Sequence, residues 1–114
     1  MYEYRAKVIS VYDADTIRVN VSLGFGVENN GLNGKGMKLR LFGIDAPEMR
    51  GEEKEQGKRS RDYLRGLIDG KEIIIKTVKD RTGKYGRYLA HIYLDGLYIN
   101  DYLVDQGYAI YKKY

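Results

Sequence analysis

The sequence contains no cysteine, and His91 is the only histidine among its 114 residues. Without cysteine the chain can form no disulfide, no thiolate nucleophile and no cysteine-based zinc site. With one histidine, catalysis by a histidine pair and zinc sites built from several histidines are also excluded. His91 falls in a predicted strand, where a structural or surface role is the simpler interpretation.

Long apolar runs are missing as well. No stretch approaches the ~20 residues needed to span a bilayer, and the first residues, MYEYRAK, contain no signal-peptide core. We therefore expect no membrane partner and, if the chain is full length, a cytoplasmic protein. The length favours a single domain over residues 1–114, and we expect a monomer. The 20 basic and 16 acidic residues leave a net charge of +4, which favours an anionic partner without identifying it.

Short runs of β-branched and aromatic residues predict five strands. These runs cover residues 4–12, 15–23, 37–43, 71–78 and 88–94. Apolar residues at helical spacing predict a helix over about 53–69 that ends at Gly70. A short second helix is predicted over about 101–106, with Asn100 as its N-cap and Gly107 after its end.

The remaining segments are predicted to be loops and turns. Residues 24–36 are rich in glycine and asparagine and are expected to form a mobile loop, and residues 79–87 a basic turn. The final residues YAIYKKY are expected to add one short strand. Three strands, a helix, two strands and a helix predict a β-dominated α+β protein. The expected architecture is an OB-fold, a five-stranded antiparallel barrel with a helix between strands three and four and a short C-terminal helix.

Two segments bring carboxylates to the ends of predicted strands: DADT at 13–16 and RLFGIDAPE at 40–48. Asp15 and Asp45, with a backbone carbonyl and waters, would offer the oxygen ligands that Ca²⁺ prefers. Pro47 favours an extended backbone in the residue before it, which can hold Asp45 and Glu48 in a fixed relation. Carboxylates around a hard cation are suited to activating water for attack on a phosphodiester.

A third segment, KYGR at 84–87, adds a second arginine to the one at position 40. Arg40 and Arg87 are rigid bidentate donors suited to phosphate oxygens. Each segment alone has a simpler interpretation: Asp13 as a turn residue, Tyr-Gly-Arg as a turn, and the 12 tyrosines as strand residues instead of base-stacking platforms. Because all three segments occur together, those simpler interpretations would have to hold independently.

The chain resembles the staphylococcal-nuclease-like (thermonuclease) domains from about Lys7 to Tyr108. The matching stretches are VYDADTIRV, KLRLFGIDAPE, GKRSRDYLRGLIDGKEI, KYGRYLAHIYLDG and YINDYLVDQGYA. The resemblance implies an OB-fold endonuclease that hydrolyses DNA and/or RNA with Ca²⁺ as cofactor. It also implies cleavage of the 5′ P–O bond, leaving 3′-phosphate ends.

The resemblance also implies roles for individual residues. The metal ligands would be Asp15, Asp45 and the backbone carbonyl of Ala46, and the catalytic residues Arg40, Glu48 and Arg87. Nucleotide-binding residues would be Lys84 and Tyr85, with Tyr111 and Tyr114 as candidates for stacking on the base.

Two rival functions remain from other classes. One is a catalytically silent OB-fold module that binds nucleic acid or protein, and the other is a structural protein-interaction domain. The two aspartates, the glutamate and both arginines implied by the resemblance are all present, which favours the nuclease. The choice between DNA and RNA, and between endo and exo cleavage, stays open at the level of the sequence.

Overall fold

Short strands dominate the structure, a computed structural model that describes residues 2–79 and 88–112. The strands are β1 (Tyr2–Asp13), β2 (Thr16–Ser22), β3 (Glu28–Asn29), β4 (Met37–Leu41), β5 (Ile44–Asp45), β6 (Glu72–Lys79), β7 (Tyr88–Leu94), β8 (Leu97–Tyr98) and β9 (Ile110–Tyr111). The helices are the 3₁₀ turn η1 (Gly51–Glu53), α1 (Lys54–Ile68) and α2 (Ile99–Asp105). The predicted long strands and the long helix are therefore confirmed to within a few residues at their ends.

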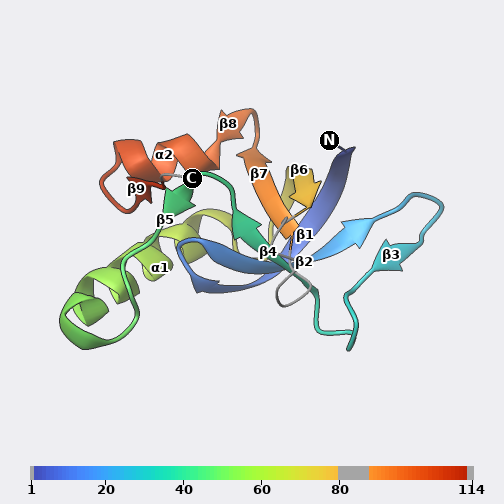
Figure 1. Cartoon of the computed structure of the whole chain (residues 1–114). Coiled ribbons are helices and arrows are strands. Elements are labelled where there is room, and N and C mark those ends of the chain that lie inside the picture. The colour runs from blue at the N-terminus through green and yellow to red at the C-terminus, as the bar shows by residue number, and fades with distance from the viewer. Residues whose placement is uncertain (1, 80–87, 113–114) are drawn as a thin grey trace.

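Five strands close into a barrel in the order β1, β6, β7, β4, β2 and back to β1 (Figure 1). This is the predicted OB-fold, with α1 inserted between the third and fourth barrel strands. One seam differs from the purely antiparallel barrel expected from the sequence, because β4 and β7 pair in parallel. Parallel neighbours require a long crossover, and here α1 and β6 lie between β4 and β7 in the chain.

The barrel interior is filled by one face of each strand. Alternation over residues 15–23 predicts that Ile17, Val19, Val21 and Leu23 share one buried face. Leu23 lies beyond the end of β2 and is exposed, whereas the first three are buried. Leu39 and Leu41 of β4 are fully buried beside them. From α1, Leu64 and Ile68 reach the same apolar cluster, so the helix covers the core with the face that its spacing indicates.

Three local predictions need correction. The segment 24–36 is not wholly irregular, because β3 forms within it and pairs with the end of β2. The segment 44–50 likewise contains β5, which pairs with β9. Asn100 is not the N-cap of the last helix: α2 begins at Ile99 and the cap position is Tyr98. Of the predicted basic turn, residues 80–87 lie outside the described residues.

The segment carrying β3 extends as an arm at the opposite end of the molecule from α1 and α2 (Figure 1). The molecule is correspondingly elongated, with extents of 45 × 30 × 24 Å. Within the described ranges, no helix has the length and apolar character needed to cross a membrane.

Candidate active site

The turn between β1 and β2 presents two aspartates. Asp13 Oδ1 accepts a hydrogen bond of 3.0 Å from the backbone N–H of Asp15, which is the local bond by which aspartate favours tight turns. Between them Ala14 is fully buried. Asp15 Oδ1 in turn accepts a 3.1 Å hydrogen bond from the Thr16 hydroxyl. The turn therefore fixes both carboxylates at one end of the barrel.

Arg40 of β4 reaches these carboxylates from the neighbouring strand, where it pairs in register with Thr16. Its side chain is only 10% exposed. Nη1 donates to the carbonyl oxygen of Ile44 at 3.0 Å. Nη2 forms a salt bridge with the carboxylate of Asp45 and lies 3.6 Å from Asp15 Oδ2. A single guanidinium thus joins the β1–β2 turn to the segment after β4.

That segment is held against the turn by its own backbone. The N–H of Ala46 donates to Asp15 Oδ2 at 2.8 Å, and β5 places Asp45 opposite Ile110 of β9. On the other side, Gly57 of α1 approaches so closely that an added Cβ would lie 2.2 Å from the carbonyl oxygen of Glu48. The absence of a side chain at that position lets α1 support the loop directly.

Buried Asn100 of α2 ties the end of β4 to β7. Its Nδ2 donates to the carbonyl oxygens of Phe42 at 2.9 Å and Ala90 at 3.1 Å. Its Oδ1 accepts from the N–H of Ile92 at 3.0 Å. The side chain predicted to cap a helix instead braces the chain that leads into Asp45.

These segments enclose an open, polar pocket of about 530 Å³. Its lining includes five acidic residues and two basic ones: Asp13, Asp15, Asp45, Glu48 and Glu53 against Lys38 and Arg40. Glu48 is exposed on the surface of the molecule. Within the described lining, negative charge is therefore in excess, even though the whole chain carries +4.

The pKa of Asp13 is shifted by its surroundings. Burial first, then a side-chain hydrogen bond with Asp15 and the negative charge of Asp15, raise this pKa from 3.8 to about 7, although the backbone N–H of Asp15 acts in the opposite direction. Two carboxylates at such short range disfavour the state in which both are ionised. A cation in the pocket would relieve this repulsion.

The donor chemistry of the pocket fits an oxygen-liganded divalent cation. Its acidic side chains offer oxygen alone, which suits hard ions such as Ca²⁺. In the arrangement described for residues 2–79 and 88–112, no three His, Cys, Asp or Glu side chains converge as a ready-made metal cage. Arg40 occupies the space between Asp15 and Asp45 instead. Water and backbone oxygens would have to complete the coordination shell.

The structure brings together five of the ten site residues singled out from the sequence. Asp15, Asp45, Ala46, Arg40 and Glu48 all line this pocket, from segments up to 33 positions apart. Their functional roles remain predictions. Arg87, Lys84, Tyr85 and Tyr114 lie outside the described residues.

Tyr111 is placed beside the pocket but is not part of its lining. It belongs to β9, where it pairs with Ile44, and its hydroxyl donates to Asp101 Oδ1 at 3.3 Å. Ile110, its neighbour in β9, is the residue that lines the pocket. Alternation along a strand sends adjacent side chains to opposite faces, so a role for Tyr111 in base stacking would need a substrate that reaches around β9.

Sequence reasoning did not single out three further lining residues, Tyr12, Lys38 and Glu53. A signal existed for Lys38, because residues two apart on a strand share a face and Lys38 precedes Arg40 by two. Tyr12 directly precedes the DADT segment. Nothing in the sequence pattern indicated that Glu53, at the end of η1, would reach the same pocket.

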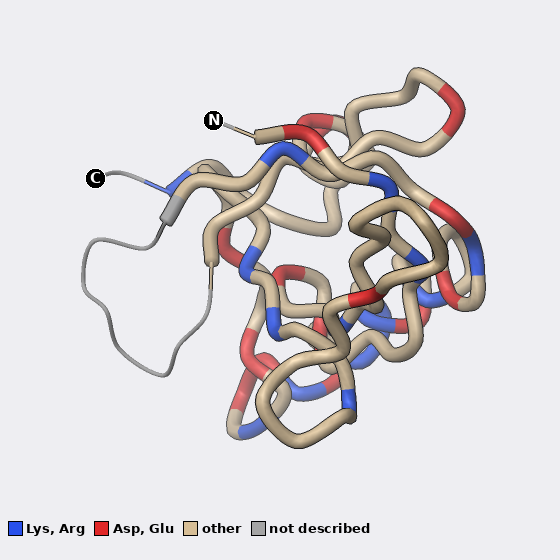
Figure 2. Tube along the Cα trace, turned by 90° about the vertical axis from the view of Figure 1, so that its right-hand side faces the viewer, with Lys and Arg blue, Asp and Glu red and all other residues tan. Residues whose placement is uncertain are grey.

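Basic residues are spread over much of the described fold and interspersed with acidic ones (Figure 2). The net positive charge therefore does not by itself mark one face as the interface for an anion.

Comparisons with known proteins agree with the geometry. Residues 38–114 match the family model described as staphylococcal nuclease homologue. The chain is 30% identical over 115 residues to the thermonuclease of Staphylococcus hyicus, which covers 98% of this chain and 62% of that protein. It is also 30% identical over 110 residues to an uncharacterised protein of Bacillus anthracis, covering 93% of this chain and 46% of the relative.

A third relative is a probable staphylococcal-like nuclease of Oryza sativa subsp. japonica, 36% identical over 76 residues. That match covers 67% of this chain and 19% of the rice protein. The chain thus spans roughly half the length of the first two curated relatives.

Proposed function

The chain belongs to the staphylococcal nuclease homologue family, and on that premise we propose that it is a nuclease that hydrolyses phosphodiester bonds of DNA or RNA. The observation that carries the proposal is the pocket in which Arg40 lies between Asp15 and Asp45 with Glu48 at its edge. A phosphodiester needs donors for its oxygens and a base for the attacking water. Both kinds of group line this one pocket.

We propose Ca²⁺ as the cofactor, held by Asp15, Asp45 and the backbone carbonyl of Ala46. Support comes from the lining, in which the described acidic side chains offer oxygen ligands and outnumber the basic ones. When bound, such an ion polarises a phosphoryl oxygen and lowers the pKa of coordinated water.

Arg40 is proposed to stabilise negative charge that develops on the phosphoryl oxygens. Its guanidinium is already held by the Ile44 carbonyl and Asp45, so it needs little reorganisation when charge forms. Glu48, exposed at the edge of the pocket, is proposed to orient the attacking water or take its proton. Arg87 is proposed as the second phosphate donor on the strength of the family resemblance.

The remaining details of the reaction follow the same resemblance. We propose cleavage of the 5′ P–O bond to leave 3′-phosphate ends, endonucleolytic attack, and nucleotide contacts by Lys84, Tyr85, Tyr111 and Tyr114. End-labelling of the products distinguishes this outcome: 3′-phosphate ends resist polymerase extension until a phosphatase removes the phosphate.

The deciding experiment is incubation with circular plasmid and with single-stranded DNA and RNA, in Ca²⁺ or with a chelator. We expect cleavage that requires the cation. Glu48→Gln keeps the shape of the side chain but removes the base, so it should lower the rate by roughly 10²–10⁴-fold with folding unchanged by circular dichroism. Glu72→Gln on β6, outside the pocket lining, is the matched control and should cleave at the normal rate.

Intact nucleic acid under every cation condition, with binding retained, would replace this proposal with the silent OB-fold binding module. Normal turnover by Glu48→Gln would keep the nuclease but remove Glu48 from its mechanism.

A further inference from the structure

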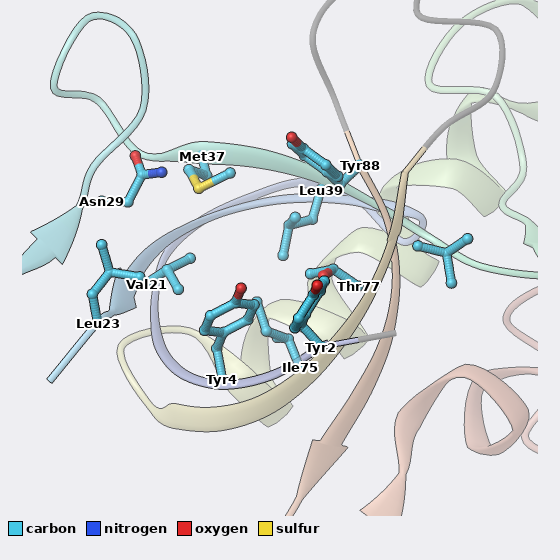
Figure 3. A pocket seen from close by; sticks show the side chains of 11 residues that line it. Tyr2, Tyr4, Val21, Leu23, Asn29, Met37, Leu39, Ile75, Thr77 and Tyr88 are labelled. Atoms are coloured by element: carbon cyan, nitrogen blue, oxygen red, sulfur yellow. The ribbon is translucent and has the colours of Figure 1, made fainter.

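A second pocket, of about 660 Å³, opens at the end of the barrel formed by the start of β1 and the end of β2 (Figure 3). Its floor is apolar and includes Val21, Leu39 and Ile75. Among the residues that the structure describes, it shares no lining residue with the candidate active site. The reaction proposed above therefore leaves this pocket without a role.

The walls of this pocket combine aromatic rings with a few polar groups. Tyr2 and Tyr4 lie along one side, and Tyr88 lies across from them with Met37 beside it (Figure 3). The ring centroids of Tyr2 and Tyr4 are 6.5 Å apart. Asn29 also lines the pocket and carries both a donor and an acceptor. Flat aromatic faces with a few hydrogen-bonding groups suit a planar, polar-edged ring such as a nucleobase.

A groove of about 550 Å³ adjoins both this pocket and the active site. Among the described residues it shares Asn29, Met37 and Tyr88 with the tyrosine-lined pocket, and Lys38 with the active-site pocket. Arg18 also lines it. The groove therefore lies next to each of the two pockets through residues of β4.

The positive charge of the groove comes from side chains on two paired strands. Arg18 of β2 and Lys38 of β4 are register partners, and each lies two residues from the Thr16–Arg40 pair. Two residues along a strand span about 7 Å, comparable to the separation of neighbouring phosphates in an extended nucleic-acid strand. In the described part of the chain neither cation forms a salt bridge. Arg18 Nη1 donates to the carbonyl oxygen of Gly36 at 3.4 Å, and Gly36 also lines the groove.

We propose that a single nucleic-acid strand runs from the active site over Lys38 and Arg18 and places one base in the tyrosine-lined pocket. The inference rests on the proposed function and deepens it, because it adds a base subsite remote from the cleaved bond. A paired base cannot enter a concave pocket without leaving its stack. The strand must therefore be single or locally opened. The adjoining cations favour an anion over an apolar peptide, and several cations suit the successive phosphates of a polyanion better than the single carboxylate of a fatty acid.

Binding of fluorescein-labelled oligothymidylates of increasing length, measured by anisotropy in chelator, tests the base subsite. Affinity should rise once the probe is long enough to span the groove. Tyr2→Leu and Tyr4→Leu should each weaken binding of long probes by roughly fivefold to a hundredfold and leave short probes unaffected. Tyr2 is 71% exposed, so its replacement carries little risk to folding. Tyr93→Leu on β7, outside this pocket, is the control.

The cationic groove has its own test in the salt dependence of binding. Arg18→Gln should make the slope of log affinity against log salt shallower by about 0.7, the value for one lost phosphate contact on a single strand. Lys71→Gln, at an exposed position between α1 and β6, should leave the slope unchanged. Probes with 4-thiothymidine along their length should crosslink to tyrosines 2, 4 or 88.

The outcomes separate this inference from the proposed nuclease. Cation-dependent cleavage with affinity that is independent of probe length and of the tyrosines would overturn the subsite and leave the nuclease standing. Length-dependent, tyrosine-dependent binding without any cleavage would overturn the nuclease and keep the strand path. A fluorescent fatty acid that binds the pocket and is not displaced by long oligothymidylate would also overturn the inference.

Discussion

Asp13 is a turn residue whose pKa is changed by its surroundings. Its carboxylate accepts the N–H of Asp15, which is an ordinary structural bond. Burial beside the second carboxylate then raises its pKa to about 7. The folded protein consequently holds this proton at pH values where the unfolded chain, with a pKa near 3.8, has released it.

That difference predicts a pH-dependent contribution to stability. Because the folded pKa is the higher one, the contribution is fully present below about pH 3.8 and is lost as pH rises through about 7. Asp13→Asn keeps an acceptor oxygen without the charge. We therefore expect the free energy of unfolding of the variant, relative to the unmodified protein, to increase between pH 4 and 7 and to level off above that range.

Urea unfolding at several pH values, with chelator present, measures this difference. The chelator matters because a bound cation would stabilise the ionised form of Asp13. A stability difference that stays constant from pH 4 to 8 would contradict the assigned shift.

Asn100 is the second residue whose environment decides its role. It makes three hydrogen bonds, to Ile92, Phe42 and Ala90, from a fully buried position. Asn100→Ala should lower the free energy of unfolding by about 2–4 kcal/mol, because buried backbone groups lose their partner. Asn33→Ala in the exposed arm should change it by less than about 0.5 kcal/mol. Equal midpoints of urea unfolding for the two variants would contradict the bracing role of Asn100.

At the scale of elements, α1 supports the loop that carries Glu48 through a close backbone approach. The helix carries two glycines with opposite surroundings: a Cβ at Gly57 would lie 2.2 Å from Glu48 O, whereas a Cβ at Gly66 would meet nothing within 4 Å. Glycine lowers helix stability in both places. Only at Gly57 does the packing of the helix require it.

The two glycines form a matched pair for mutation. Gly66→Ala should raise the free energy of unfolding by about 0.5–1 kcal/mol through helix propensity alone. Gly57→Ala should lower it by about 1–3 kcal/mol, the usual cost of overpacking, and should also slow cleavage by displacing Glu48. Thermal or urea unfolding ranks the variants. A higher free energy of unfolding for Gly57→Ala would show that α1 does not pack closely against the backbone of Glu48.

At the scale of the whole molecule, the two proposed metal ligands belong to separate parts of the chain. Asp15 lies in the β1–β2 turn and Asp45 in β5, and Arg40 and the Ala46 N–H link them. A cation held by both would crosslink these parts in the folded state alone. Ligand binding of this kind stabilises a protein by about 2.7 kcal/mol when the free ligand is at one hundred times its Kd.

We therefore expect Ca²⁺ to raise the unfolding temperature in a concentration-dependent way, and Asp15→Asn to reduce or abolish that rise. Calorimetry or circular dichroism measures it. Mg²⁺ in place of Ca²⁺ tests selectivity, because Mg²⁺ is smaller and demands stricter octahedral geometry. An unfolding temperature that does not change in millimolar Ca²⁺ would contradict the proposed metal site.

The sequence by itself determined the elements that depend on local chemistry. The apolar alternation in β2 and the apolar spacing in α1 show which side chains are buried when the chain folds. Both elements could therefore be predicted from the sequence without knowledge of the tertiary structure. The carboxylate turn at Asp13 and the end of α1 before Gly70 are similarly local. The same patterns sufficed for the barrel, because short strands of this kind bury their apolar faces most completely when the sheet closes.

Only the tertiary structure decided which distant groups meet. The parallel seam between β4 and β7 is part of the closed barrel, and the small pairs β2–β3 and β5–β9 join segments that only the folded chain brings side by side. Asn100 could bond backbone groups 58 positions away only because α2 packs against β7 and the end of β4. Burial of the Arg40 guanidinium likewise needs Asp15 and Asp45 on two sides. Long-range contacts carry no local signal, so these features came from the fold.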